Sequence, residues 1–291
     1  MPKNPTWARL CKKPPLLLPA AHDALTAKLI EKAGFRAYQI GGFALAAARH
    51  ALPDVGLDDF GDTRPAVSDI MAASKLPVMV DCDTGGDDAK SVVRMVHRYE
   101  QMGVSAIFLE DQQMPKRCGH MANKKILPPD IYRRKLRAAL DARHSDDFFI
   151  MARTDAYAIE GLKGALRRGE AYVKEGADGL FIDGVETIVD LGAIGSSFDV
   201  PLAANMFEGG GKTPIVTADA LKKMGFAMVL YPTSLVFRVA KTLETALRAM
   251  LEQRLDEAGP IMSFDHFEDM IDLPGWKKIE RTGGEDVPDV G

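Results

Sequence analysis

Cysteine is scarce in this sequence, and it has none of the long apolar runs that a membrane-spanning helix needs. The three cysteines, Cys11, Cys82 and Cys118, form an odd and widely spaced set, which argues against a disulfide framework or a zinc site. No apolar stretch approaches the roughly 18 residues of a membrane span. The N-terminus lacks the basic-then-apolar order of a secretory signal. We therefore expect a cytoplasmic protein with free thiols and no membrane partner.

Excess positive charge is also missing. The formal net charge of the 291 residues is −4, which argues against a nucleic-acid partner, because such a partner demands a basic face. Low-complexity linkers are absent too, so we expect a single catalytic domain over residues 1–257. Residues 258–291 are expected to form a helical extension and tail that packs on this domain or on a partner subunit.

What the chain does contain is a repeated alternation of short apolar runs and amphipathic helical stretches. The apolar runs occupy residues 16–18, 37–40, 78–80, 106–109, 148–152, 179–182, 202–204 and 228–230. The clearest helical stretches cover about 23–32, 89–101, 129–142, 162–175 and 235–253. Such alternation predicts a parallel sheet, and eight units favour a closed (β/α)8 barrel of the TIM type. No glycine-rich phosphate fingerprint follows the first strand, which argues against a Rossmann fold.

Polar residues gather at the carboxyl ends of the expected strands. They are Asp81, Asp83, Glu110, Arg153, Asp155, Asp183 and Asn205. In a parallel barrel these ends lie at one face, where barrel enzymes keep their active sites. Helix capping explains any single Asp or Asn here equally well, but caps do not need two alternating acids and an arginine. The set therefore predicts an active site.

The first group within this set indicates a metal ion. Asp81 and Asp83 lie two residues apart at a strand end, so both can point to one side and, with Glu110, surround a hard divalent cation. Mg²⁺ prefers such oxygen ligands, and Mn²⁺ is a possible substitute. Cys82, between the two acids, is interpreted as a small buried packing residue rather than a ligand.

The second group is the segment Lys116-Arg117-Cys118-Gly119-His120. A thiol beside two cations and a histidine is expected to have a lowered pKa and to be exposed enough to react. Cys118 is therefore a candidate nucleophile or proton donor. The alternative is an incidental surface cysteine in a basic loop, which we favour less because a buried strand leads into this loop.

Arg153 and Asp54 have two open interpretations each, and Gly41 and Gly42 have one. Arg153 can bind a carboxylate or oxyanion bidentately, or it can form a structural pair with Asp155. The paired glycines belong to a loop region that could offer backbone N–H groups to an anion. Asp54 lies in residues 52–56 of the same loop region. It either belongs to this anion-binding loop or simply forms a turn, and spacing alone does not separate these alternatives.

Together these motifs resemble the isocitrate lyase / phosphoenolpyruvate mutase superfamily. The matching segments, in order, are 21–27, 41–42, 52–56, 80–85, 109–112, 115–120, 152–156 and 210–214. Within that superfamily, the cysteine of Lys-Arg-Cys-Gly-His marks the carbon–carbon lyase branch, which includes 2-methylisocitrate lyase, 2,3-dimethylmalate lyase and oxaloacetate hydrolase. The resemblance implies a (β/α)8 barrel whose last helix is swapped between subunits, in homotetramers built as dimers of dimers.

The resemblance also implies roles for individual residues. Asp81, Asp83 and Glu110 would hold Mg²⁺, with Asp54 near the metal through water, and Cys118 would be the general acid. Substrate oxygens would be bound by Gly41, Gly42, Gly119, His120, Arg153, Asp183 and Asn205. The substrate would be a 2-hydroxy di- or tricarboxylate, cleaved to a 2-oxo acid and a carboxylic acid. An oxaloacetate-acting hydrolase or decarboxylase and a carboxyphosphonoenolpyruvate-type phosphonomutase are the alternatives within the same superfamily.

Three departures from the superfamily pattern bear on the substrate. Ile40 replaces the serine that often precedes the paired glycines, and Asp183 replaces a longer Glu. After Asn205 the chain reads Met206-Phe207-Glu208-Gly209, without the hydroxyl residues that contact the extra carboxylate in tricarboxylate lyases. These departures favour a dicarboxylate substrate.

Overall fold

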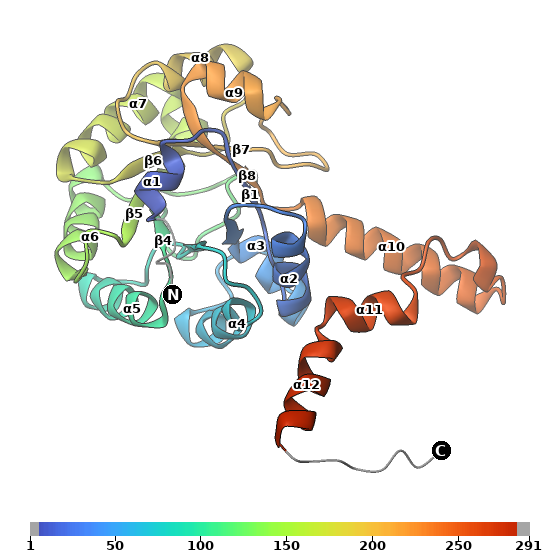
Figure 1. Cartoon of the computed structure of the whole chain (residues 1–291). Coiled ribbons are helices and arrows are strands. Elements are labelled where there is room, and N and C mark those ends of the chain that lie inside the picture. Colours follow the sequence, from blue (N-terminus) through green and yellow to red (C-terminus); the bar gives the residue numbers. More distant parts are fainter. Residues whose placement is uncertain (1–5, 284–291) are drawn as a thin grey trace, which may run out of the picture. The chain divides into compact units, whose positions relative to one another are not determined.

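The computed structural model describes residues 6–283 and confirms the predicted (β/α)8 barrel (Figure 1). Its strands are β1 (Leu16–Pro19), β2 (Tyr38–Ile40), β3 (Val78–Asp81), β4 (Ala106–Glu110), β5 (Phe149–Thr154), β6 (Gly179–Ile182), β7 (Leu202–Asn205) and β8 (Phe226–Tyr231). The order is β1-β8-β7-β6-β5-β4-β3-β2, with every paired neighbour parallel. A parallel bridge between Ala20 and Gln39 joins the chain after β1 to β2 and closes the ring.

The helices that follow strands β1 to β7 surround this ring (Figure 1). In chain order, the helices of residues 6–283 are α1 (Trp7–Cys11), α2 (Ala24–Lys32), α3 (Gly42–His50), α4 (Phe60–Ala72), α5 (Ala89–Met102), α6 (Pro129–Ala142), α7 (Tyr157–Glu175), α8 (Ile188–Gly195), α9 (Ala218–Met224) and α10 (Ser234–Leu251), then η1 (Leu255–Glu257), α11 (Phe264–Met270) and α12 (Leu273–Gly283). Helix α7 is interrupted at Gly161, whose φ is +67°. Its regular part therefore begins close to residue 162, as predicted.

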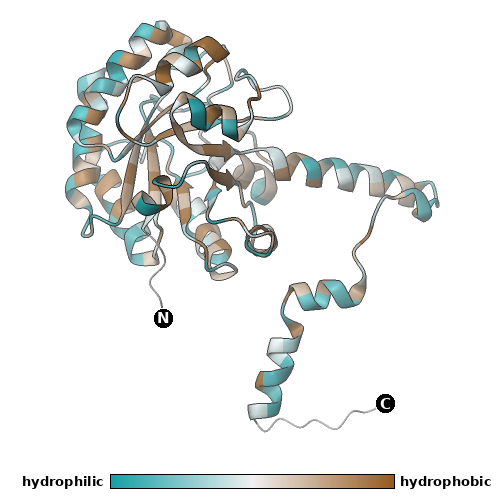
Figure 2. Cartoon of the chain, turned by 45° about the horizontal axis from the view of Figure 1, so that its top comes forward, coloured by the Kyte–Doolittle hydropathy of each residue, from teal (hydrophilic) through white to brown (hydrophobic). Residues whose placement is uncertain are grey.

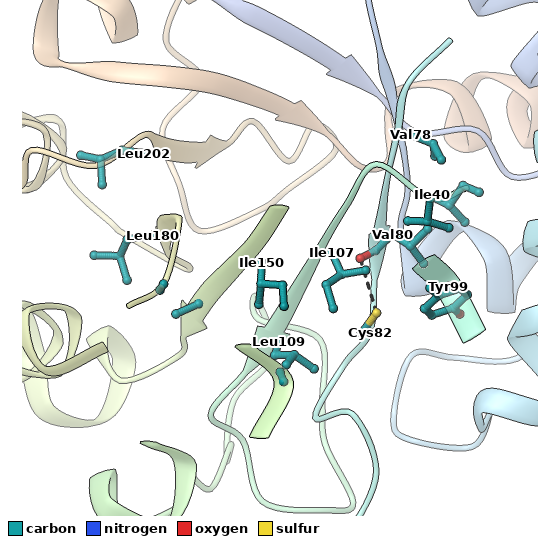
Figure 3. Packing of buried hydrophobic residues seen from close by; sticks show 14 of the residues in the cluster. Ile40, Val78, Val80, Cys82, Tyr99, Ile107, Leu109, Ile150, Leu180 and Leu202 are labelled. Atoms are coloured by element: carbon teal, nitrogen blue, oxygen red, sulfur yellow. Dashed lines mark hydrogen bonds between the residues drawn. The ribbon is translucent and has the colours of Figure 1, made fainter. Parts of the chain in front are cut away.

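The strands separate two apolar layers because successive side chains of a strand point to opposite faces. The outer layer, between sheet and helices, includes Ile40, Val80, Cys82, Ile107, Leu109, Ile150 and Leu180 (Figure 3). The Cys82 thiol lies 3.7 Å from the Val80 carbonyl oxygen within this layer, which confirms its interpretation as a packing residue. In Figure 2 the strands are largely hydrophobic, while the surrounding helices carry much of the hydrophilic surface.

The inner layer positions the polar residues. It contains Leu16, Met79, Phe108, Phe149, Met151, Phe181, Ala203 and Met228, with Trp7 of α1 packed among them. Two residues beyond Met79 comes Asp81, and two beyond Phe108 comes Glu110. The same step leads from Met151 to Arg153, from Phe181 to Asp183 and from Ala203 to Asn205. The two-residue period of a strand thus places the polar side chains on the inner face at its carboxyl end.

Asp111 follows Glu110 and points the other way, into a fully buried polar cluster behind the strands. Its carboxylate accepts hydrogen bonds from the hydroxyls of Thr154 (2.7 Å) and Tyr172 (2.8 Å) and from the backbone N–H of Asp155 (3.0 Å). Arg168 of α7 lies 3.2 Å from the same carboxylate. This cluster ties the end of β4 to the end of β5, which carry Glu110 and Arg153.

The chain divides into two compact units, one ending at Phe237 and the other beginning at Arg238, within α10. The second unit contains the rest of α10, η1, α11 and α12. Our predicted boundary at residues 257/258 stays a prediction. Within the described part of the chain, no helix is long and apolar enough to cross a membrane.

Arg168→Met is expected to lower the free energy of unfolding by about 3–5 kcal/mol, because it leaves the Asp111 carboxylate buried without its cation. The measurement is urea denaturation of wild type and variant. Arg167→Met is the matched control, since Arg167 is exposed and its pair with Glu160 spans 3.1 Å at the surface. The control should lose no more than about 1 kcal/mol. Equal losses in the two variants would contradict the positioning role of the cluster.

Candidate active site

One narrow pocket opens at the carboxyl ends of the strands, with a cavity volume of about 40 Å³. The predicted site residues that line it are Gly41, Gly42, Asp54, Asp81, Cys118, Gly119, His120, Arg153, Asp183 and Asn205. Asp83 and Glu110 lie beside it. Asp83 lines an adjoining crevice with Asp54 and Lys116, and Glu110 is fully buried. The structure thus brings the predicted residues together, whereas the roles predicted for them stay predictions.

Gly41 and Gly42 do not form the loop that the sequence suggested; they begin helix α3, with Gly41 as its N-cap. The backbone N–H of Gly42 donates a 3.3 Å hydrogen bond to Asp81 Oδ2. A Cβ at position 42 would come within 3.3 Å of Asp83 Oδ1 and 3.5 Å of Asp81 Oδ2. Glycine here lets the positive end of the helix approach two carboxylates closely.

The acidic side of the pocket is built around Lys116. Its ammonium group donates to Asp54 and lies 2.5 Å from Asp83 Oδ1, and the lysine side chain is only 4% exposed. Asp83 in turn donates its backbone N–H to Asp81 Oδ1 at 3.0 Å. Glu110 Oε2 lies 3.2 Å from Arg153, but neither Glu110 carboxylate oxygen receives a hydrogen bond.

These carboxylates are short of positive charge. Burial, and then the neighbouring Asp83, raise the pKa of Asp81 to about 6. Burial also raises the pKa of Asp54, against the opposing effect of Lys116, and the pKa of Glu110, against that of Arg153. A buried acid with a raised pKa lacks compensating charge.

The donor atoms are of the chemical kind that a divalent cation prefers. They are hard carboxylate oxygens, two of them on Glu110 without a hydrogen bond, and Mg²⁺ prefers such ligands, often with only one or two direct carboxylates. Across residues 6–283, however, no three or more His, Cys, Asp or Glu side chains are grouped so that they could hold a metal ion. The Lys116 ammonium group pairs with two of these acids, Asp54 and Asp83, and Arg153 lies 3.2 Å from a third, Glu110.

Arg153 forms the structural pair with Asp155 that was one of its two sequence interpretations, and it also lines the pocket, while its binding of a substrate carboxylate stays a prediction. Its Nε donates to Asp155 Oδ2 at 3.0 Å, and its Nη2 lies 2.8 Å from Asp183 Oδ2. The guanidinium carbon also lies 5.9 Å and 5.3 Å from the ring centres of Phe108 and Phe181. The arginine is therefore held in one orientation by acids and rings together.

Asp183, Asn205 and His120 form a hydrogen-bonded group on the opposite side. Although burial alone would raise the pKa of Asp183, Arg153, His120 and Lys124 lower it to about 2. Asn205 Nδ2 donates to Asp183 Oδ1 at 3.1 Å and lies 3.2 Å from His120 Nε2. Burial lowers the pKa of His120, which favours its neutral form.

Cys118 differs from our expectation in two respects. It is buried, with 7% of its surface exposed, and burial raises the pKa of its thiol to about 12 instead of lowering it. The sequence prediction was wrong because Lys116 and Arg117 do not bring positive charge to the sulfur: Lys116 is occupied by Asp54 and Asp83, and Arg117 is exposed. The thiol is therefore protonated at neutral pH.

Sequence reasoning missed the structural roles of Lys116 and Lys124. Both ammonium groups are buried, and Lys124 donates to Asp155 Oδ1 at 2.8 Å and to the carbonyl oxygen of Gly119. The available signal was the presence of two lysines flanking Cys118 and His120 at a strand end. Adjacent Lys125 is exposed, so composition alone could not tell which lysine of the pair points inward.

Comparison with known proteins places this site in a family. Residues 8–251 match the phosphoenolpyruvate phosphomutase family. The chain is 38% identical to 2,3-dimethylmalate lyase of Eubacterium barkeri, covering 94% of each chain. It is 36% identical to 2-methylisocitrate lyase of Halalkalibacterium halodurans, covering 84% of this chain and 80% of the relative.

Solved structures agree. A crystal structure of 2,3-dimethylmalate lyase, a member of the PEP mutase/isocitrate lyase superfamily, superposes with a TM-score of 0.89 at 28% identity, covering 98% of this chain and 96% of that one. A complex of phosphonopyruvate hydrolase with oxalate and Mg²⁺ gives a TM-score of 0.79 at 29% identity, covering 91% and 93%. The chain therefore belongs to the phosphoenolpyruvate phosphomutase family and is an enzyme, a carbon–carbon lyase of this superfamily.

Proposed function

We propose that this enzyme cleaves a 2-hydroxy dicarboxylate of the 2,3-dimethylmalate type to a 2-oxo acid and a carboxylic acid, with Cys118 as the general acid. One observation carries the proposal: a buried, protonated thiol shares a narrow pocket with Arg153 and with a group of carboxylates suited to a cation. A carbon–carbon lyase needs an acid at the carbon that loses its bond. The relatives named as lyases support the reaction class.

The reaction balances without a further reactant. The substrate hydroxyl loses its proton, its oxygen forms the carbonyl of the 2-oxo acid, and the adjacent carbon–carbon bond breaks. The electron pair passes to the other fragment as an aci-carboxylate. Cys118 then gives its proton to the carbon of that fragment, and the proton lost by the hydroxyl restores the thiol before the next turnover. Arg153, Gly119 and His120 would hold the carboxylate oxygens in the pocket.

Mg²⁺, or Mn²⁺ in its place, would be held by Asp81, Asp83 and Glu110, with Asp54 near the metal through water. When bound, such an ion stabilises the negative charge that develops on the oxygen of the 2-oxo acid fragment. The support from this chain is the unpaired Glu110 carboxylate and the charge deficit among the acids. The helix α3 N-terminus would keep Asp81 oriented toward them.

The wall of the pocket supports a substrate with alkyl groups rather than a third carboxylate. Phe207 lies where the tricarboxylate lyases carry hydroxyl residues, and its ring packs against His120 with ring centres 4.4 Å apart. Phe43 and Phe237 meet the same ring edge-on, at 5.5 Å and 6.1 Å. A carboxylate placed against these rings would lose water without gaining a partner, which is costly.

We further propose that the active form is a homotetramer, assembled through a swapped C-terminal helix, in the cytoplasm. The support is a set of large apolar side chains exposed on α10, α11 and α12, including Leu247 (64%), Leu251 (85%), Phe264 (73%) and Trp276 (63%). Exposed apolar surface of this extent marks interaction sites. A reducing compartment would keep Cys118 as the thiol that its proposed role needs.

Cys118→Ala is expected to reduce turnover of 2,3-dimethylmalate at least about a hundredfold, because the proton donor is lost. Product formation from 2,3-dimethylmalate, 2-methylisocitrate and oxaloacetate should be measured with Mg²⁺, for this variant and for Cys82→Ala as the control. The wild type should prefer the first substrate, and Cys82→Ala should retain turnover. Unchanged lyase turnover in Cys118→Ala would exclude the acid role. Activity on oxaloacetate alone would favour the hydrolase or decarboxylase alternative.

Asp81→Asn should weaken Mg²⁺ binding by at least about tenfold, because a hard cation loses a charged oxygen ligand. Isothermal titration without substrate measures this directly and does not depend on turnover. Asp87→Asn, an exposed change in the loop that follows β3, serves as the control and should bind Mg²⁺ as the wild type does. The same affinity in Asp81→Asn and wild type would remove Asp81 from the metal site.

Leu247→Glu should dissociate the proposed tetramer, because it places a charge within the exposed apolar surface of α10. Light scattering after size exclusion gives the molar mass. Lys222→Glu, an equally exposed charge change on the barrel helix α9, should leave the mass unchanged. A monomeric wild type at micromolar concentration would overturn the oligomer proposal.

A further inference from the structure

The loop over the pocket, residues 113–125, is held shut at its base and at two internal points. At the base, the Gln113 N–H donates to the Lys125 carbonyl at 2.8 Å, next to an antiparallel bridge between Gln112 and Ile126. The first internal point is the Lys116 ammonium among the acids. The second is the Lys124 ammonium, on the far side of Cys118.

Lys124 is the most enclosed basic group of this loop, with a side chain that is 1% exposed. Its Nζ lies 2.8 Å from Asp155 Oδ1 and also donates to the carbonyl oxygen of Gly119. One ammonium group therefore connects the loop to the end of β5 and fixes the loop's own backbone beside Cys118. Lys124 does not line the pocket, so it does not reach the space for a substrate.

Asp155 connects this ammonium group to the active-site arginine. Its Oδ2 accepts the Nε–H of Arg153 at 3.0 Å, while its Oδ1 is shared between Lys124 and Arg153 Nη2 at 3.3 Å. Both oxygens of the carboxylate are thus occupied, and the backbone N–H of Asp155 is in turn bound to Asp111 at 3.0 Å. Closing the loop thus adds a second cation to the carboxylate that orients Arg153.

Gly119 makes the closed position specific. A Cβ at position 119 would overlap with Asp183 Oδ2 and come within 2.8 Å of Arg153 Nη2. The Gly119 backbone therefore rests directly on the Arg153–Asp183 ion pair, and its carbonyl oxygen is turned away to Lys124. Holding that carbonyl sets the direction in which Cys118 and His120, on either side, face the pocket.

The energetics of a buried ion pair suit a lid that must also open. The attraction between Lys124 and Asp155 in the closed state is offset by the cost of removing both charges from water. Their net contribution to closure is then small enough to be reversed in each turnover.

We propose that Lys124 is a positioning residue that holds the loop 113–125 closed and, through Gly119 and Asp155, aligns Cys118 with Arg153. The catalytic value of aligning Cys118 with Arg153 rests on the proposed function, but closure of the loop can be measured without any substrate. Opening the loop exposes the Cys118 thiol, which is buried in the closed form. The rate at which a thiol reagent modifies Cys118 therefore reports how often the loop opens.

The test compares Lys124→Met with Lys125→Met, which removes the exposed neighbouring charge. Modification by 5,5′-dithiobis(2-nitrobenzoate) is followed in each full-length variant and in the same variant carrying Cys118→Ala. We expect Lys124→Met to raise the Cys118 rate about tenfold and Lys125→Met to leave it within about twofold of wild type. With 2,3-dimethylmalate, Lys124→Met should also lower kcat/KM, whereas Lys125→Met should not.

The Cys118→Ala backgrounds separate loop opening from general loosening, because only Cys11 and Cys82 then remain to react. Faster modification of those two buried thiols would mean that the fold has loosened, and would overturn the positioning role. If Lys124→Met does not fold, Lys124→Gln removes the charge and keeps a hydrogen-bond donor on a slightly shorter side chain, with the same rise expected. An unchanged Cys118 rate would overturn the proposal. A raised rate in an enzyme that cleaves none of the substrates would support the anchor and reject the proposed reaction.

Discussion

The site depends on a surplus of carboxylates gathered at one end of the barrel. Asp54, Asp81, Asp83, Glu110, Asp155 and Asp183 lie in or beside the pocket. Among the described residues that pair with them there, the cations are Arg153, Lys116 and Lys124. Two of these three come from the loop that carries Cys118. The segment that carries the thiol therefore also carries most of the compensating positive charge.

The barrel accommodates this concentration of charge because successive side chains of a strand point to opposite faces of the sheet. Glu110 points inward to the pocket, while adjacent Asp111 points outward to Arg168 and Tyr172. Glu110 and Asp111 are adjacent in sequence, yet their carboxylates lie in different environments because they point to opposite faces of the sheet. The outward cluster is fully paired and fixes the strand ends, whereas Glu110 keeps two oxygens without hydrogen bonds. Two adjacent residues, Asp111 and Glu110, thus supply a rigid support and a carboxylate without hydrogen bonds, respectively.

Much of this could be predicted from the sequence, for a physical reason. Strand positions follow from local apolar runs, and the two-residue period then assigns Asp81, Glu110, Arg153 and Asp183 to one face. This is why the strands and the gathering of the site residues were predicted correctly. The helix beginning at Gly42 was not, because two consecutive glycines read as a loop when the carboxylates facing that helix are unknown.

The rest depends on partners that are distant along the chain. Lys124 and Lys125 are identical in type and adjacent, and only the location of Asp155 decides which one is buried. Likewise, the segment around Cys118 looks cationic in sequence. Lys116 pairs with Asp54, which is 62 residues away in the sequence. Its positive charge is therefore not available to stabilise a thiolate at Cys118. Local composition cannot report charge that has already been neutralised by a remote partner.

The same surplus of acids decides which chemistry the thiol can perform. Burial is the main cause of the raised Cys118 pKa, and the charges of Asp54 and Asp183 raise it further. A thiolate at this position would add another negative charge to a pocket that already lacks positive charge, which is unfavourable at low dielectric. A nucleophilic cysteine would need the opposite surroundings. The arrangement instead keeps the sulfur protonated, and the proposed general-acid role requires a protonated thiol at the start of each turnover.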